Sequence, residues 1–132
     1  MLLPPSMRRR FLLGLGLTAI VSALASASCL SPTLPLPPPD VESISPAAEP
    51  GLWNLAGTCA PGALVTVLNE DTGLGAVFED REETGHWSVQ IAAEECDLGW
   101  VSQQRGSDDS PRNSFTIEPL SPDQPGQTSL CK

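Results

Sequence analysis

Between residues 51 and 119 the chain alternates apolar and polar residues in short runs, and turn-forming residues separate these runs. In the clearest run, Trp87, Val89 and Ile91 share one face of an extended chain. This period of two predicts β-strands with one buried face. Turns such as Pro61-Gly62 leave connections too short for helical crossovers. We therefore expect an all-β fold, a small sandwich of about seven antiparallel strands.

Residues 1–29 have the composition of a bacterial signal peptide. Arg8, Arg9 and Arg10 supply the positive start, and residues 11–25 supply an apolar stretch rich in Gly and Ser. This stretch is shorter than the roughly 18–20 apolar residues needed to cross a bilayer. We therefore expect export followed by cleavage rather than a permanent membrane span.

Two cleavage sites fit the end of this segment. Ala25-Ser26-Ala27 fits ordinary signal peptidase, with cleavage after Ala27. Cys29 follows small residues and resembles the lipidated cysteine of a lipobox, although Ser26 stands where lipoboxes carry Leu, Ile or Val. We expect lipidation of Cys29, which would anchor the chain to a membrane. By the same resemblance, Leu30 suggests the outer membrane, and without acylation the protein would be periplasmic or secreted.

The rest of the chain divides by composition. Residues 30–50 are rich in proline and predict a semi-rigid tether, because proline lacks a backbone donor and favours extended structure. Within it, residues 41–45 alternate and could form a first edge strand. Residues 51–119 form the predicted sandwich, and residues 120–132 are predicted to be a loose tail.

The predicted mature chain is strongly acidic, with four basic against sixteen acidic residues after Arg10 and a formal charge near −12. This charge argues against nucleic-acid binding, because no basic patch is present to neutralise phosphates. Several acidic pairs are interpreted as solvent-exposed turn residues. These pairs are Glu70-Asp71, Glu79-Asp80, Glu82-Glu83 and Asp108-Asp109.

Export to an oxidising compartment makes disulfides plausible for the four cysteines. We expect a Cys59–Cys96 bridge, because both cysteines fall at ends of predicted strands. One alternative is that Cys59 or Cys96 is a free buried thiol. A zinc site is not expected, since no second pair of ligands stands nearby. Cys131 is then left over, and a Cys29–Cys131 bridge is a further alternative if Cys29 is not acylated.

Three stretches, LAGTCAPGALVTVLNEDTG, ETGHWSVQIAAEE and GWVSQQRGSDDSPRNSFTI, resemble a bacterial immunoglobulin-like domain of the adhesin and cell-surface type. The resemblance covers about half of the chain. It implies an immunoglobulin-like β-sandwich with a binding or structural role at the cell surface. Transthyretin-like modules share a turn like DTG and a later Gly-x-Trp strand, and they are the second architecture. The residues that match the immunoglobulin-like pattern are Gly57, Pro61, Gly62, Ala63, Val65, Val67, Gly85 and Trp87.

No catalytic motif is recognisable, and the single histidine, His86, lies on the predicted outward face. We therefore expect no enzyme and no cofactor, but a module that binds an unknown protein or cell-surface partner. A periplasmic inhibitor or assembly accessory is one alternative. A carbohydrate-binding module is another, but Trp53, Trp87 and Trp100 are all predicted to lie in the core. Binding is expected in the loops, at Glu70, Asp71, Asp108, Asp109 and Arg112.

Overall fold

A computed structural model of the protein describes residues 34–124 and 128–132, so the predicted export segment and Cys29 lie outside the described residues. One compact unit, residues 35–132, contains every described strand. Its strands are β1 (Asp40–Pro46), β2 (Leu52–Thr58), β3 (Leu64–Asn69), β4 (Gly75–Glu79), β5 (His86–Ala92), β6 (Leu98–Arg105), β7 (Asp108–Asp109) and β8 (Asn113–Thr116). In these described ranges, no helix has the length and apolar character needed to span a membrane.

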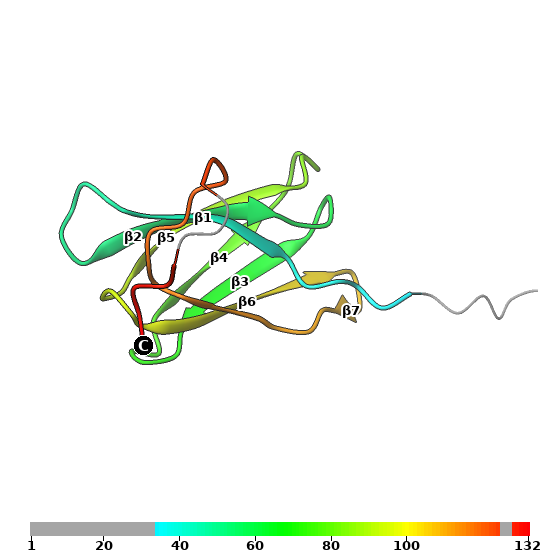
Figure 1. Ribbon diagram of the computed structural model, residues 1–132. Helices are drawn as coiled ribbons and strands as arrows, with labels where there is room; N and C mark the ends of the chain where they lie inside the picture. The colour runs from blue at the N-terminus through cyan, green and yellow to red at the C-terminus, as the bar shows by residue number, and fades with distance from the viewer. Residues whose placement is uncertain (1–33, 125–127) are drawn as a thin grey trace, which may run out of the picture. The chain divides into compact units, whose positions relative to one another are not determined.

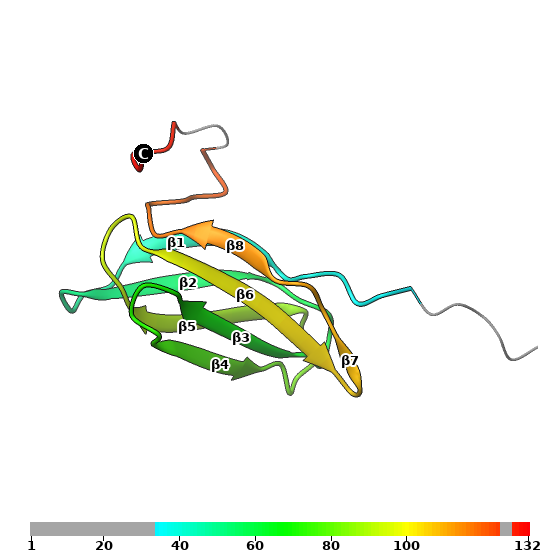
Figure 2. The same cartoon turned by 90° about the horizontal axis from the view of Figure 1, so that it is seen from below.

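The strands form two antiparallel sheets, which confirms the predicted all-β sandwich (Figure 1). One sheet has the order β1-β2-β5. The other has the order β4-β3-β6, and both β7 and β8 pair with the remaining edge of β6. Figure 2 shows β4, β3, β6 and β8 side by side in this second sheet.

The core lies between the sheets and is built from the alternate residues that point inward. The alternation of Trp87, Val89 and Ile91 is confirmed, because Trp87 and Ile91 are buried and Val89 packs against them. Such apolar burial supplies most of the favourable free energy of folding. The buried apolar side chains of the core are Ile44, Trp53, Leu55, Val65, Val67, Trp87, Ile91, Ala93, Val101 and Ile117.

The sandwich has two ends, which we call the tether end and the far end. At the tether end, the segment that precedes β1 enters beside the β6–β7 turn (Figure 1). At the far end lie the β3–β4 turn, the β5–β6 loop and the C-terminus. Because β2 and β5 are antiparallel, Thr58 pairs with His86 at the tether end and Leu52 pairs with Ala92 at the far end.

The module begins earlier than predicted. The edge strand expected at residues 41–45 is confirmed as β1, so the boundary drawn at residue 51 is wrong. The prolines before it are also attached to the module. Gln103 donates a hydrogen bond to the carbonyl of Pro37, and Asn113 donates one to the carbonyl of Pro39. The end of the predicted tether is therefore fixed to the sandwich.

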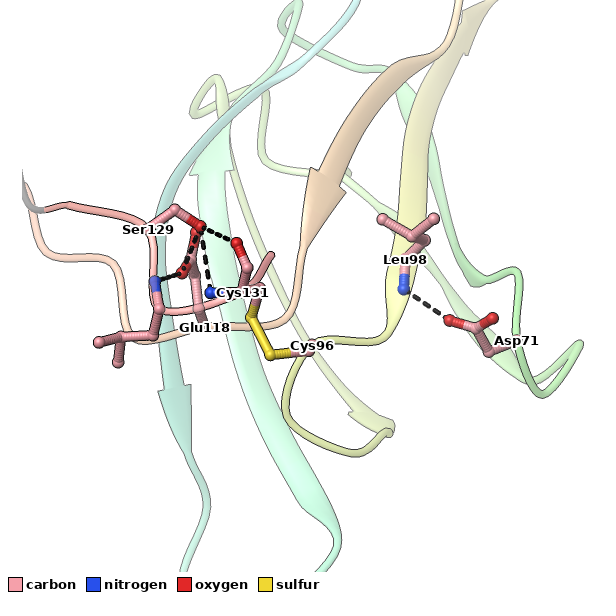
Figure 3. The surroundings of a disulfide bond; sticks show 7 residues. Asp71, Cys96, Leu98, Glu118, Ser129 and Cys131 are labelled. Atoms are coloured by element: carbon pink, nitrogen blue, oxygen red, sulfur yellow. Dashed lines mark hydrogen bonds between the residues drawn. A yellow bond between two sulfur atoms is a disulfide. The ribbon is translucent and has the colours of Figure 1, made fainter.

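The C-terminal segment, expected to be loose, is attached at several points. Ile44 and Leu120 exchange two backbone hydrogen bonds, of 3.0 and 2.9 Å, on the edge of β1 that β2 leaves free. Near the terminus, the Glu118 carboxylate accepts hydrogen bonds from the Leu130 amide and the Ser129 hydroxyl (Figure 3). The described parts of residues 120–132 thus belong to the folded module.

A disulfide joins Cys96 to Cys131, so the predicted Cys59–Cys96 bridge is wrong (Figure 3). The reason is the antiparallel pairing of β2 with β5. Cys59 follows β2 at the tether end, where its amide donates to the carbonyl of Gly85, whereas Cys96 follows β5 at the far end. Cys59 is a free thiol. Since Cys131 is used by Cys96, the alternative Cys29–Cys131 bridge does not form.

Replacing Cys131 with serine is expected to lower the free energy of unfolding by roughly 3–4 kcal/mol, because the bridge closes a long loop in the unfolded chain. Urea denaturation without reductant measures this loss. Reduction should destabilise the wild-type protein by a similar amount and leave the Cys131→Ser variant unchanged. Equal stability of the reduced and oxidised wild-type protein would contradict the assignment.

Candidate functional site

The two sheets present different outer faces. On the β1-β2-β5 sheet the outward side chains are mostly polar, and Gln90 of β5 donates a hydrogen bond of 3.0 Å to Asn54 of β2. Ser45 and Ser88 are exposed on the same face. A polar outer face of this kind is the ordinary solvent-exposed side of an antiparallel sheet.

On the other sheet, the outward side chains of β4, β3 and β6 include large apolar groups. We call this surface the β6 face. Val77 is 62% exposed, Leu98 is 52% exposed and Leu64 is 36% exposed. The strand register places Leu68 beside Trp100 and Thr66 beside Ser102. The β6 face comprises Leu64, Thr66, Leu68, Val77, Glu79, Leu98, Trp100, Ser102 and Gln104.

A groove of about 210 Å³ lies in the part of the β6 face toward the tether end. Its walls combine apolar groups with hydroxyl, amide and charged groups. It is smaller than the roughly 300–1,000 Å³ of sites that enclose drug-sized molecules. The groove therefore has room for one small group, such as a side chain of a partner. Its lining residues are Leu64, Thr66, Trp100, Ser102, Gln103, Gln104, Asp109, Ser110 and Arg112.

Arg112 and Trp100 form a stacked pair in this groove. The guanidinium carbon of Arg112 lies 4.1 Å from the centre of the Trp100 ring, which is cation–π geometry. Within the described residues, the only ion pair joins Arg81 to Glu79, so the Arg112 guanidinium has no carboxylate partner there. The stacking holds its planar set of N–H donors in place while leaving them open to a ligand.

Trp100 was expected in the core, and this prediction is wrong. Trp100 is half-buried on the outer side of β6, because its neighbours Gly99 and Val101 point inward. Gly99 packs closely against Phe115, since a side chain on Gly99 would meet the Phe115 ring at 2.6 Å. The inward positions of β6 are thus filled by the odd-numbered residues, and Trp100 points outward.

The predicted binding residues do not form one site. Asp109 and Arg112 share the groove, and Asp108 lies beside it in β7. Glu70 and Asp71 lie at the far end of the same sheet. Asp71 has a structural contact there, because its carboxylate accepts a hydrogen bond of 2.7 Å from the Leu98 amide (Figure 3).

Asp80 was interpreted as a surface residue, but it is only 2% exposed. Its carboxylate accepts hydrogen bonds from the amides of Gly62, Thr84 and Gly85 and from the Thr84 hydroxyl. Burial acts to raise the pKa of Asp80, but these hydrogen bonds lower it by more, so the pKa lies below the ordinary 3.8. The ionised carboxylate therefore organises the β4–β5 loop.

Two buried amide side chains, also missed from the sequence, hold loops in a similar way. Asn69 donates a hydrogen bond of 2.7 Å to Asp97 and accepts one of 3.0 Å from the Asp71 amide, so it joins two far-end loops. Gln103 accepts one of 2.7 Å from the Ala60 amide and also holds Pro37. Each amide satisfies backbone groups that would otherwise be unpaired.

The free thiol of Cys59 borders a second hollow, of about 240 Å³, beside the proline segment at the tether end. Partial burial raises the pKa of Cys59 above its ordinary 9.0, and the negative charge of Asp80 raises it further. At neutral pH the group is therefore a protonated thiol, which is a weak nucleophile. The part of the chain with assigned coordinates contains no group of three or more His, Cys, Asp or Glu able to hold a metal ion.

No protein-family model, curated protein or solved structure matches this chain. The resemblance to bacterial immunoglobulin-like domains therefore stays a prediction. The β6 face and its groove are identified from their geometry alone.

Replacing Asp80 with asparagine is expected to destabilise the protein near pH 7. A neutral amide accepts hydrogen bonds less strongly than a carboxylate, and its N–H groups would face the backbone N–H donors that the carboxylate now accepts from. Since the pKa of Asp80 is lowered by folding, its contribution is present above about pH 4 and is lost as the pH falls through the folded-state pKa. Thermal unfolding of both proteins from acid to neutral pH measures this. The difference in melting temperature should narrow in acid, and a constant difference would contradict the assignment.

Proposed function

We propose that this protein is exported to the cell envelope, anchored there through Cys29, and that it binds a partner protein through the β6 face. The module is proposed to be immunoglobulin-like and to act by binding rather than by catalysis. The observation that carries the proposal is the contrast between the two outer faces of one small sandwich. Large apolar side chains exposed together commonly mark interaction sites.

The composition of the β6 face supports a protein partner. Centres of protein interfaces are enriched in aromatic residues and Arg and depleted of Lys, Glu and Asp. Trp and Arg also dominate among residues that carry most of the binding energy. The β6 face has Trp100 and Arg112 stacked at its groove, with apolar side chains extending along the sheet. Two acidic residues lie in or beside the face: Glu79, beside Leu64 at the end of β4, is paired with Arg81, and Asp109 lines the groove.

The described end of the proline segment lies on the Cys59 side of the module. The proline segment borders the hollow at Cys59 and lines none of the groove beside Trp100. Gln103 borders both hollows, and its hydrogen bonds to Ala60 and Pro37 hold the proline segment on its own side. A module fixed in this way would hold the β6 face in a constant orientation to the last residues of the tether.

Carbohydrate binding is the second candidate, and the half-exposed Trp100 favours it. Sugar rings stack on open aromatic faces. In this groove the guanidinium of Arg112 already covers one face of the Trp100 ring. This arrangement favours a protein contact over a stacked sugar.

Anchoring is tested by the intact mass of the protein isolated from its own membrane, before and after reduction. We expect a mature chain that begins at an acylated Cys29, with a gain of two hydrogens on reduction of Cys96–Cys131. A mature chain that begins at Ser28 and carries no lipid would refute the anchor and leave the binding proposal to its own test.

Binding through the β6 face is tested by a photo-reactive benzoylphenylalanine at position 102, in cells that express the full chain. The matched control carries the same group at position 88, because Ser88 is a strand residue on the polar outer face. We expect one dominant protein cross-link from position 102 and none of that size from position 88. Equal cross-linking from the two positions, or none from position 102, would refute the proposal.

A further inference from the structure

Basic residues are distributed unevenly between the two ends of the sandwich. Among the described residues, the arginines Arg81, Arg105 and Arg112 all lie at or toward the tether end, in the β4–β5 loop, at the end of β6 and after β7. Lys132 is the basic residue at the far end. In the described ranges, seven carboxylates lie at each end: Glu49, Glu70, Asp71, Glu94, Glu95, Asp97 and Glu118 at the far end, and Asp40, Glu79, Asp80, Glu82, Glu83, Asp108 and Asp109 at the tether end. The far end is the more acidic of the two because it has one basic residue against three.

The far end directly adjoins the apolar part of the β6 face. Leu98, the exposed first residue of β6, donates its amide to the Asp71 carboxylate, and its carbonyl accepts a hydrogen bond of 2.8 Å from the Glu70 amide. The Glu70 side chain is exposed at this border. A ligand that covers Leu98 therefore comes close to the charges of the β3–β4 turn.

The opposite part of the β6 face contains charges of both signs, since Asp109 lines the groove beside Arg112. There the Arg112 guanidinium, stacked on Trp100, offers N–H donors that no described carboxylate occupies. From Leu98 to Gln104 the strand extends about 20 Å, at about 3.3 Å per residue. The far part of the β6 face thus borders the carboxylates of the β3–β4 turn, whereas the groove part contains an arginine without an ion-pair partner among the described residues.

We propose that the partner of the β6 face is a protein whose contact surface has an apolar centre, basic residues toward the far end, and a carboxylate that pairs with Arg112. This inference rests on the proposed function and adds the charge and the orientation of the partner. A basic partner also fits the acidic chain as a whole, since opposite charge accelerates encounter and fixes orientation.

A second copy of this chain is a poor fit to the same surface. The mature chain has a formal charge near −12, so two copies repel one another at long range. In a two-fold dimer through the β6 face, the tether end of one copy, which has the arginines, could meet the far end of the other. Most of the surrounding carboxylates would still have no cationic partner. Self-association is therefore one of the outcomes that would overturn the inference.

The test uses the protein cross-linked from position 102. Its affinity for the full-length protein in detergent is measured between about 50 and 500 mM salt, across which screening shortens the reach of charges. We expect the affinity to fall as salt rises. Glu70→Lys should weaken binding roughly tenfold, whereas the matched control Glu42→Lys, on an exposed position of β1, should change it less than about twofold.

Arg112 is tested separately. Arg112→Ala should weaken binding roughly thirtyfold or more, as for a central interface residue. Arg112→Lys should recover only part of that loss, because lysine lacks the planar donor set that pairs with a carboxylate. Mapping the cross-linked peptide should show that the partner residues next to position 102 are followed, in the direction of Leu98, by basic residues of the partner.

The outcomes separate the two proposals. No specific cross-link from position 102 refutes binding through the β6 face. A specific partner whose affinity is independent of salt, and equal effects of Glu70→Lys and Glu42→Lys, would overturn the charge inference while leaving the interface in place. Identification of a second copy of this chain or of a glycan as the cross-linked species would also overturn it.

Discussion

The packing of Trp87 against Gly57 joins the three strands of the first sheet. Gly57 has no side chain, and a Cβ at this position would collide with the Asp40 carbonyl. The Trp87 indole N–H donates to this carbonyl and to that of Thr58, each at 3.2 Å. Because the same indole is almost fully buried, one residue of β5 fixes both the core and the entry of the chain into β1.

The strands could be predicted from the sequence because burial of one sheet face has a local signature. The alternation around Trp87 and the weaker alternation at residues 41–45 both correspond to observed strands. The outward position of Trp100 is predictable from its neighbour Val101, because an apolar Val101 that points into the core directs Trp100 to the other face. Because Trp100 was expected in the core, the groove beside it was missed, while Arg112 and Asp109 were named for another reason.

Non-local contacts account for the remaining errors. Gln103 is buried because it bonds to backbone groups of Ala60 and Pro37, which are distant in sequence. Asp80 joins the local amides of Thr84 and Gly85 to the more distant amide of Gly62. The alternation of apolar and polar residues does not reveal these donors and acceptors. The cysteine pairing depends in the same way on which ends of β2 and β5 meet. The antiparallel register decides that Cys96 meets Cys131 rather than Cys59.

The hydrogen-bonded pair of Ile44 and Leu120 affects how the free edge of β1 can associate with other chains. A free strand edge is a template on which another chain can add a strand and begin a fibril. Here part of that template on β1 is already occupied by the protein's own C-terminal segment. The C-terminal segment, which the Cys96–Cys131 disulfide attaches to the module, thus blocks the addition of another strand at this position. Proteolytic removal of the C-terminal segment would expose this part of the β1 edge.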